Sequence, residues 1–258
     1  MIGLQRFLHP TTIGLEPEFS HLREFMLSLP ERFAHQEGTL IHNGRNQLRM
    51  FVYEGTEYVV KSYQIPIFIN RLVYGFLRAS KGERSLRNAR QLMKIGIGSP
   101  RPVGFLNVRN GILFTHSYMV TVRSGCPYRY DMLLSKRFSC LEKICREIGR
   151  CTAIMHEHGM YNMDYSRGNI LFGIKSDGDV FLEMVDLNRI RFGKISLQKG
   201  CRNFDRLPAT AQMHRWMAEE YARVRHFSPE DCYREIRHYR LLQDTTEDHS
   251  MEELYLDK

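Results

Sequence analysis

Four polar residues, which lie within or next to apolar segments, are of types that could carry out chemistry. Asp164 and Asn169 lie five residues apart in the segment Met160 to Phe172, MYNMDYSRGNILF, between a predicted helix and a predicted strand. Asp186 follows the apolar stretch FLEMV. Lys61 stands among apolar neighbours in YVVKSY, where burying its charge is costly unless an anion meets it. These four residues are the candidate catalytic set.

Phosphoryl transfer requires the side chains that this set offers. The reaction needs an acid that faces the acceptor hydroxyl, oxygen ligands for Mg²⁺ and a cation on the nucleotide phosphates. Asp164 suits the acid that faces the hydroxyl. Asn169 and Asp186 suit the metal, which prefers hard oxygen ligands, and Lys61 suits the α- and β-phosphates of ATP. A turn cap at Asp164 or a surface lysine with its stem laid on apolar surface are plainer interpretations, but neither explains the whole set.

The first half of the chain predicts a β-rich unit after a helical start. Residues 1–37 have apolar residues at helical spacing before Pro30. Residues 38–63 predict a meander of three antiparallel strands, with turns at Asn43-Gly44-Arg45-Asn46 and Glu54-Gly55. The stretch SKGERSLRNARQLMKIG predicts a helix that stops at its last glycine, and GILFTHSYMVTV predicts a further strand.

The second half predicts a mainly helical unit. SGCPYRY, residues 124–130, is the predicted linker. SCLEKICREIGRCTAIMHEHG predicts an amphipathic helix that ends at Gly159, NILFGI and VFLEMVDL predict two short strands, and the chain from Pro208 predicts helices. The predicted organisation is a helical extension over 1–37, an N-lobe over 38–123 and a C-lobe over 124–258.

Composition favours a folded protein without disulfides. The 258 residues are 43% hydrophobic and 26% charged, which is typical of a globular core. Six cysteines occur without a C-x-x-C pair, which predicts reduced thiols in a cytoplasmic protein. The start of the chain does not read as a signal peptide, and no apolar run reaches the roughly 18 residues of a membrane span. We therefore expect a soluble or peripheral protein.

The net charge of +8 is unevenly distributed. Residues 61–109 hold ten Lys and Arg against one acid, Glu83, whereas residues 244–258 hold six acids against one base. A basic face predicts an anionic partner such as a phosphate, an acidic glycan or an anionic membrane surface, although a solvated helix face is the plainer alternative. Nucleic acid is not the predicted partner, because the basic stretch lacks the interleaved aromatic residues of a stacking platform.

Three motifs follow one another in the chain order of a known fold. VVKSY, NMDYSRGN and VDLN resemble the signatures V-A-I-K, H-R-D-x-x-x-x-N and D-F-G of protein-kinase-like proteins. Together with IHNGRN, RASKGERS, GIGSPRP and NFDRL they make residues 38–210 resemble the lipopolysaccharide core kinase family. That family includes heptose kinases and kinases of 3-deoxy-manno-octulosonic acid (Kdo), and the similarity is strongest to its branch in Bacteroides-like bacteria.

The resemblance implies an α+β, bilobal protein-kinase-like fold, with an antiparallel β-sheet N-lobe and a shortened, mainly helical C-lobe. It implies ATP and Mg²⁺ as cofactors and a sugar hydroxyl of lipopolysaccharide or of a lipid A-linked precursor as acceptor. The location it implies is cytoplasmic, at the inner face of the cytoplasmic membrane. The implied nucleotide residues are Gly44, Arg45, Asn46, Lys61 and Glu83, the implied metal ligands are Asn169 and Asp186, and the candidate substrate residues are Ser166, Arg167 and Arg189.

The chain departs from the kinase pattern at three places. Asn162 replaces the histidine before the catalytic acid, which predicts a less rigid loop that keeps its chemistry. The first hairpin carries one glycine, Gly44, instead of three. Glu83 is the only acid in the helix that should supply a partner for Lys61, and the favoured register places Arg87 at the partner position.

Two other functions remain open at this stage. A pseudokinase that binds nucleotide and scaffolds partners is favoured by the three departures but not by the retained catalytic set. A kinase of small molecules such as aminoglycosides is disfavoured, because such enzymes line the acceptor site with acids and this chain is basic. The apolar segment 65–81 predicts core packing in the N-lobe, with a lipid-facing surface as the alternative.

Overall fold

The computed structural model describes residues 11–63, 79–110 and 113–242. The chain forms two compact units, residues 1–90 with 100–123 and residues 91–99 with 124–258. Most of the apolar segment 65–81 and the whole acidic tail 244–258 lie outside the described residues, so the predictions made for them are not tested.

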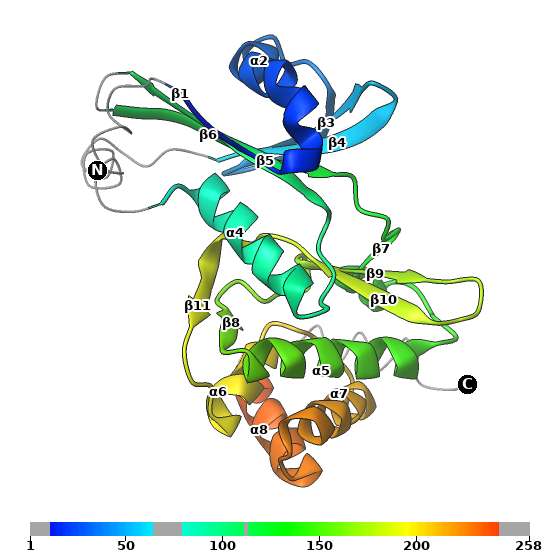
Figure 1. Cartoon of the computed structure of the whole chain (residues 1–258). Coiled ribbons are helices and arrows are strands. Elements are labelled where there is room, and N and C mark those ends of the chain that lie inside the picture. Colours follow the sequence, from blue (N-terminus) through cyan, green and yellow to red (C-terminus); the bar gives the residue numbers. More distant parts are fainter. Residues whose placement is uncertain (1–10, 64–78, 111–112, 243–258) are drawn as a thin grey trace. The chain divides into compact units, whose positions relative to one another are not determined.

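The first unit is built on a six-stranded antiparallel sheet (Figure 1). Its spatial order is β1 (Thr11–Leu15), β5 (Pro102–Asn110), β6 (Leu113–Val122), β4 (Thr56–Ser62), β3 (Gln47–Tyr53) and β2 (Thr39–Asn43). The predicted meander of β2, β3 and β4 is confirmed. Glu54 and Gly55 connect β3 to β4 with φ of 48° and 75°, and two consecutive positive φ values are the mark of a tight type I′ hairpin.

The beginning of the chain differs from the prediction of helix over residues 1–37. Thr11–Leu15 form strand β1 along β5, with Thr11 opposite Val108, because a β-branched TTI stretch before Pro17 fits a strand better than a helix. A 3₁₀ turn, η1 (Pro17–Leu22), then leads into α2 (Arg23–Ala34). Helix α2 continues past Pro30, since Phe33 beyond it packs on the ring of Tyr118 at a centroid distance of 5.1 Å.

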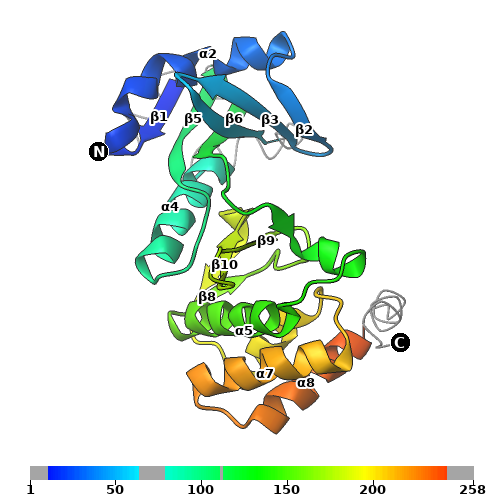
Figure 2. The ribbon, with the colours of Figure 1, turned by 90° about the vertical axis from the view of Figure 1, so that its right-hand side faces the viewer.

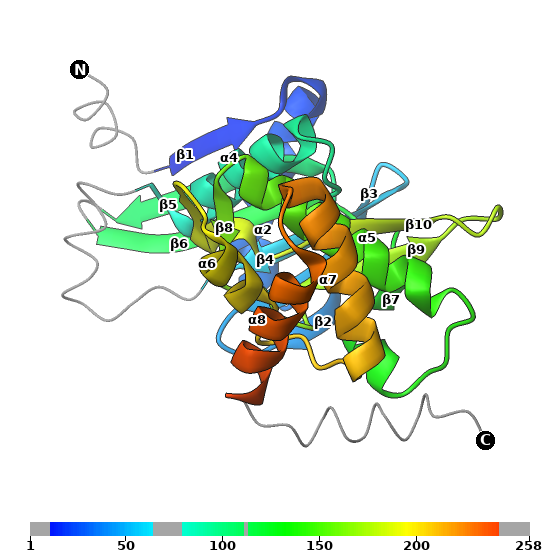
Figure 3. The same cartoon turned by 90° about the horizontal axis from the view of Figure 1, so that it is seen from below.

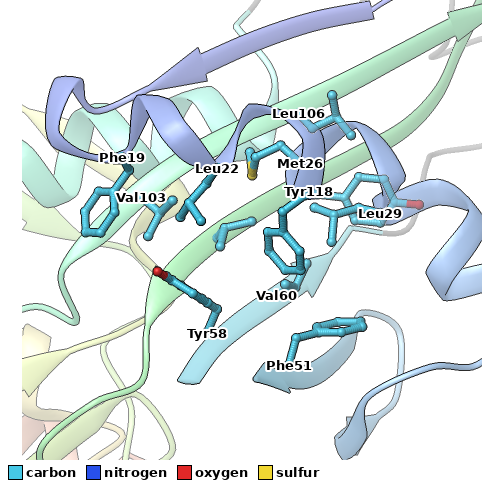
Figure 4. Packing of buried hydrophobic residues seen from close by; sticks show 12 residues of the cluster. Phe19, Leu22, Met26, Leu29, Phe51, Tyr58, Val60, Val103, Leu106 and Tyr118 are labelled. Carbon is cyan, nitrogen blue, oxygen red and sulfur yellow. The ribbon is translucent and has the colours of Figure 1, made fainter. Parts of the chain in front are cut away.

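The segment from Pro17 to Ala34 supplies one face of the core of the first unit. Leu22, Met26 and Leu29 are fully buried and face sheet residues that include Val60 and Tyr118 (Figure 4). Each such side chain contributes roughly 1.5–3 kcal/mol when it leaves water completely. This helix is therefore an integral layer on the sheet.

Helix α4 (Lys81–Lys94) follows the stretch that is not described and agrees with its prediction. Ser80 precedes it, and its Oγ accepts a hydrogen bond from the backbone N–H of Glu83 at 3.0 Å, as an N-cap does. Gly96 follows its end with φ of 77°, a left-handed conformation that glycine adopts at no steric cost.

The second unit is mainly helical. Helix α5 (Leu141–Glu157) lies against α7 (Ala211–Arg225), and α8 (Pro229–Leu241) lies against α7, as Figures 2 and 3 show from two directions. A Cβ atom at Gly149 of α5 would come within 2.4 Å of the Met217 carbonyl oxygen of α7. Only glycine allows this approach of the two helices.

Short strands and turns cover the other side of α5. One sheet has the order β10 (Val180–Met184), β9 (Ile170–Ile174), β7 (Tyr128–Arg129), and a second pairs β11 (Ile190–Phe192) with β8 (Met160–Asn162). The remaining elements are η2 (Tyr130–Leu134), η3 (Leu187–Arg189), α6 (Leu197–Cys201) and η4 (Arg202–Phe204). The predictions of α5, β9, β10 and the late helices are confirmed, whereas β5, β7, β8, β11 and α6 were not predicted.

The cysteines agree with the prediction of reduced thiols. All six are free, and Cys145, Cys151, Cys201 and Cys232 are buried. Burial raises the pKa of the thiols of Cys145 and Cys151, which keeps them protonated and unreactive. Among the described helices, none has both the length and the apolar character that a bilayer crossing requires.

Two buried histidines make the stability of the fold sensitive to acid. Burial lowers the pKa of His156 and of His214 from 6.5 to about 3. Between those pH values the unfolded chain binds protons that the native chain excludes. The free energy of unfolding should therefore be largest above pH 6.5 and fall below it by up to about 1.4 kcal/mol per pH unit for each histidine.

Urea unfolding at pH 7.5, 6.0 and 5.0 measures this dependence. Most carboxylates titrate below pH 5, so the histidines dominate that interval. An unfolding free energy that stays constant from pH 7.5 to 5.0 would contradict the assignment of neutral, buried imidazoles.

Candidate functional site

The loop between β8 and β9 is closed by two side-chain amides. The buried Asn162 accepts a hydrogen bond from the backbone N–H of Asp164 at its Oδ1, at 2.9 Å. The amide nitrogen of Asn169 donates to the carbonyl oxygen of Asp164 at 2.8 Å, and the backbone N–H of Asn169 donates to Ser166 O at 2.9 Å. Asp164 is thus fixed from both ends of its turn, and Asn162 takes part where the kinase pattern has a histidine.

A buried hydrogen-bond chain holds this loop from the side of α5. Asn203 donates from Nδ2 to the carbonyl oxygen of Asn162 at 2.9 Å, so its Oδ1 faces His156 Nε2 at 3.1 Å. His156 Nε2 must then carry the proton, and Nδ1 accepts from the Tyr221 hydroxyl at 2.9 Å. The sequence analysis assigned neither His156 nor Asn203 to the site, although Asn203 belongs to the quoted motif NFDRL. We expect both to act as positioning residues.

The loop is also anchored through Tyr165, the residue after Asp164. Its hydroxyl lies 2.5 Å from Thr152 Oγ1 of α5, and both side chains are buried. Ser166 and Arg167, the candidate substrate residues that follow, are half-buried on the loop. Their assignment to the acceptor stays a prediction.

The loop after β10 carries Asp186 in a left-handed conformation. Its φ and ψ are 57° and 51°, which aspartate tolerates better than most residues. Asn188 Nδ2 donates to Asp186 Oδ1 at 2.5 Å. Strain of this kind concentrates at functional sites, where the surrounding structure enforces it.

Backbone hydrogen bonds join the two loops. Val185 N–H donates to Asn169 O at 3.0 Å, and Met163 N–H donates to Arg189 O at 3.1 Å. These bonds and the β8–β11 pair place Asp164, Asn169 and Asp186 on adjoining loops of the second unit. Three of the four predicted catalytic residues are therefore brought together within one unit.

An arginine holds the carboxylate of Asp164. Arg189 Nη1 donates to Asp164 Oδ1 at 2.6 Å, and the side chain of Asp164 is 20% exposed against 54% for Arg189. A charge-assisted bond of this length orients the carboxylate and leaves Oδ2 for another partner. Arg189 was predicted as a substrate residue, and the geometry gives it a second role as a positioning residue for Asp164.

Substitutions at Arg189 should separate orientation from charge. We expect Arg189→Gln to lower kcat for phosphoryl transfer roughly tenfold, the effect of losing one charge-assisted hydrogen bond, and to leave the KM for ATP unchanged. Arg189→Lys keeps the positive charge but lacks the planar guanidinium group, so its kcat should lie between those of the wild type and Arg189→Gln. Initial rates at saturating acceptor measure this, and a kcat that rises in Arg189→Gln would mean that the arginine masks Asp164.

The first unit contains the fourth candidate, Lys61, on β4. Lys61 is half-buried opposite Leu48 of β3 and Met119 of β6, and its Nζ lies 5.3 Å from the centroid of the Tyr63 ring. The Tyr63 hydroxyl lies 2.8 Å from Ser85 Oγ, so β4 is tied to helix α4 beside the lysine.

The pattern of buried residues on α4 does not agree with the register that placed Arg87 as the partner of Lys61. Ser85 and Asn88 are buried, whereas Arg87, which the favoured register placed at the partner position, is exposed. Glu83 lies half-buried in the first turn of the helix. Its pairing with Lys61 stays a prediction.

The predicted phosphate hairpin is present between β2 and β3. Gly44 N–H donates to Asn46 O at 3.3 Å and closes the turn, with Gly44 and Arg45 exposed and Asn46 half-buried. Gly44 does not have a positive φ, and an added Cβ would meet only the His42 imidazole, at 2.7 Å. The turn itself does not require this glycine, and the contact of all three residues with nucleotide stays a prediction.

Part of the predicted basic face is neutralised by the beginning of the chain. Arg90 forms an ion pair with Glu16, and Arg101 lies 3.3 Å from Glu18. Arg101 also lies over the ring of Phe19, 4.9 Å from its centroid. The positive charge that faces solvent in the first unit is therefore smaller than the sequence count of residues 61–109 suggested.

The donor set of the second unit fits a magnesium ion bound with phosphate. The amide nitrogen of Asn169 donates to the carbonyl oxygen of Asp164, so the amide oxygen of Asn169 points away from that bond. Asp186 supplies a carboxylate. No cluster of three or more His, Cys, Asp or Glu suited to a metal occurs among the described residues. This agrees with Mg²⁺, which takes one or two protein oxygens and completes its shell with water and phosphate oxygens.

Comparison with known proteins establishes the class of fold. The architecture matches a solved structure of WaaP in complex with acyl carrier protein with a TM-score of 0.62, at 14% identity, over 95% of this chain and 99% of that chain. The protein-kinase-like fold implied by the family resemblance is thereby confirmed.

A second solved structure is less similar. The Rio2 kinase-ADP/Mg²⁺-phosphoaspartate complex from Chaetomium thermophilum has a TM-score of 0.49, at 12% identity, over 100% of this chain and 80% of that chain. No protein-family model and no curated protein matches the sequence.

Proposed function

We propose that the protein is an ATP-dependent kinase that phosphorylates a sugar hydroxyl, of Kdo or heptose, on the lipopolysaccharide core or its lipid-linked precursor. The observation that carries the proposal is the joining of the Asp164, Asn169 and Asp186 loops within the second unit. The kinase-like fold and the ordered sequence motifs support it.

The residues of the chain divide the reaction between them. Asp164, oriented by Arg189, accepts the proton of the acceptor hydroxyl, whose oxygen attacks the γ-phosphorus of ATP in line and displaces ADP as the leaving group. Asn169 and Asp186 would hold Mg²⁺, which supplies charge neutralisation on the phosphates. Lys61 neutralises the α- and β-phosphates, with Glu83 as its proposed partner, and Gly44, Arg45 and Asn46 are proposed to approach the nucleotide.

The acceptor is proposed to be acidic. Arg167 and Arg189 place two cations on the loops beside Asp164, which suits a carboxylate or phosphate on the acceptor better than the amines of an aminoglycoside. We also propose action at the inner face of the cytoplasmic membrane, where a lipid-linked acceptor would be met.

One observation favours a second function, a nucleotide-binding scaffold without transfer. The carboxylate of Asp164 is engaged by Arg189, as it would be in a protein whose acid no longer serves as a base. A measurement of phosphoryl transfer to an acceptor distinguishes the kinase from the nucleotide-binding scaffold.

The test is transfer of labelled γ-phosphate from Mg-ATP to purified Kdo-lipid A, core oligosaccharide and an aminoglycoside. The proposal expects label on one of the two glycans and its loss in Asp164→Ala. Nucleotide binding without label on any glycan would reject the sugar kinase and favour the scaffold. Label on the aminoglycoside alone would favour the small-molecule kinase.

A further inference from the structure

A second concentration of positive charge follows the Asp186 loop. Between residues 189 and 206 the sequence has six basic residues and one acid, Asp205. The basic residues are Arg189, Arg191, Lys194, Lys199, Arg202 and Arg206. This stretch belongs to the second unit and is separate from the basic residues of 61–109.

Two of these cations lie beside Tyr161, and two more are close enough for their charges to act on its hydroxyl. Arg191 of β11 lies opposite Tyr161 of β8, and directly opposed residues of an antiparallel pair project on the same face. Lys199 Nζ lies 5.2 Å from the centroid of the Tyr161 ring. Burial raises the pKa of the Tyr161 hydroxyl, and the nearby charges of Arg202 and Arg206 act against it. We call Tyr161, Arg191, Lys199, Arg202 and Arg206 the Tyr161 patch.

The described residues do not balance the cations of the patch with ion pairs. Arg191, Lys199, Arg202 and Arg206 are exposed, and in the described part of the chain none of them forms an ion pair with an acid. Asp205 is a carboxylate close to two of them, and burial raises its pKa against the influence of Arg206 and Arg202. Within the described segment from Arg191 to Arg206, the four cations of the patch and Asp205 have a formal charge of +3, a potential that favours an anionic ligand.

Several arginines elsewhere in the described part of this unit differ from the patch. They pair with acids, such as Arg146 with Glu219 at 2.8 Å and Arg234 with Asp231 at 2.7 Å. The charge of the Tyr161 patch is therefore a local property of β8, β11 and the α6–η4 turn.

The patch adjoins the acid that faces the acceptor. Tyr161 precedes Asp164 by three residues. Arg191 follows Arg189, the residue that orients Asp164, by two residues. Three residues of fully extended chain span about 10 Å, so the backbone of Tyr161 lies no farther than this from the backbone of Asp164. A ligand group bound there would belong to the same acceptor, away from the hydroxyl that reacts.

We propose that the Tyr161 patch binds an oxyanion, a phosphate ester or a carboxylate, carried by the acceptor at a position remote from the phosphorylated hydroxyl. Arginine forks and a tyrosine hydroxyl are suited to such oxygens, and the lysine adds a mobile point charge. This inference rests on the proposed kinase function and names a property of its substrate, a second anionic group.

The test compares two double variants of equal charge. Arg191→Gln with Lys199→Gln removes two charges from the patch, and Lys143→Gln with Lys175→Gln removes two exposed charges near the opposite end of α5. Glu157 lies fourteen positions after Lys143, which corresponds to roughly 21 Å of helix, so the control lies outside the patch. Transfer kinetics are measured with a core oligosaccharide bearing a second phosphate and with the same glycan after that phosphate is removed.

The patch variant should raise the KM for the phosphorylated glycan roughly tenfold, the equivalent of one lost charge-assisted contact, and leave kcat and the KM for ATP unchanged. The control variant should match the wild type, and the dephosphorylated glycan should not distinguish the proteins. Equal KM values for the patch variant and the wild type would overturn the proposal, as would equal effects on both glycans.

A binding measurement separates this proposal from the proposed function. Fluorescence anisotropy of the labelled phosphorylated glycan, without ATP, reports the patch even if no transfer occurs. Weaker binding confined to the patch variant, without transfer, would keep the patch and reject the kinase. The patch variant could instead bind the glycan as the wild type does but no longer sediment with phosphatidylglycerol vesicles. That result would assign the oxyanion to a lipid headgroup and overturn its assignment to the acceptor.

Discussion

Asp164→Asn should abolish most phosphoryl transfer while leaving the fold and nucleotide binding intact. Asparagine keeps the shape of the side chain and an oxygen for the hydrogen bond from Arg189, but it cannot take a proton from the acceptor hydroxyl. General-base groups contribute between about 10²-fold and 10⁴-fold to the rate, so kcat should fall within that range. Transfer of labelled γ-phosphate at saturating ATP and acceptor measures it.

Asp179→Asn is the matched control for that substitution. Asp179 is an exposed acid near the β9–β10 turn, and its Oδ1 lies 3.9 Å from Lys143 Nζ. Its substitution by asparagine removes the same negative charge at a position outside the candidate site. Its kcat should equal that of the wild type. If Asp164→Asn and Asp179→Asn had the same kcat, Asp164 would not be the base, and its bond to Arg189 would be purely structural.

Asp186→Asn should remove the dependence of nucleotide binding on Mg²⁺ and with it the transfer reaction. Asparagine tolerates the left-handed conformation at this position, so the backbone should be preserved and only the charge lost. A metal on the transferring group supplies several kcal/mol of charge stabilisation, which predicts a loss of kcat on the order of 10³-fold. Calorimetric titration with ADP, with and without Mg²⁺ and after EDTA, measures the binding.

Asp177→Asn provides the control for this second substitution. Asp177 Oδ1 accepts a hydrogen bond from the backbone N–H of Asp179 at 2.9 Å, and asparagine can accept the same bond. This variant should keep the enhancement of ADP binding by Mg²⁺. Asp186→Asn with the full enhancement would place the metal elsewhere, and a wild type without any enhancement would favour the scaffold.

The two substitutions report on different parts of one constellation. Asp164 lies on the β8–β9 loop and Asp186 after β10, and backbone bonds such as that from Val185 to Asn169 join them. Asp164→Asn should leave metal-dependent ADP binding unchanged, whereas Asp186→Asn should not. A protein in which both variants lose binding would point to collapse of the joined loops.

Local patterns determined the elements that carry the site. Apolar residues at helical spacing before Gly159 specified α5, and the alternation around Glu54-Gly55 specified the β3–β4 hairpin, because each is set by neighbours in sequence. The order of a lysine on a strand, an acid and an amide on a turn and an acid after a strand was sufficient to predict phosphoryl transfer and a kinase-like fold.

Only the tertiary structure decided how those residues are held. Strands β8 and β11 have three residues each and form because they pair with one another. Strand β1 was predicted as helix because its partner β5 lies about ninety residues away in the sequence. The ion pair from Arg189 to Asp164 and the buried chain from His156 through Asn203 to Asn162 join residues 25 to 47 positions apart. Sequence spacing does not encode such contacts, since burial and hydrogen-bond geometry arise only when distant segments pack. The sequence alone identified the candidate reacting groups, whereas packing determined their orientation and the charge around Tyr161.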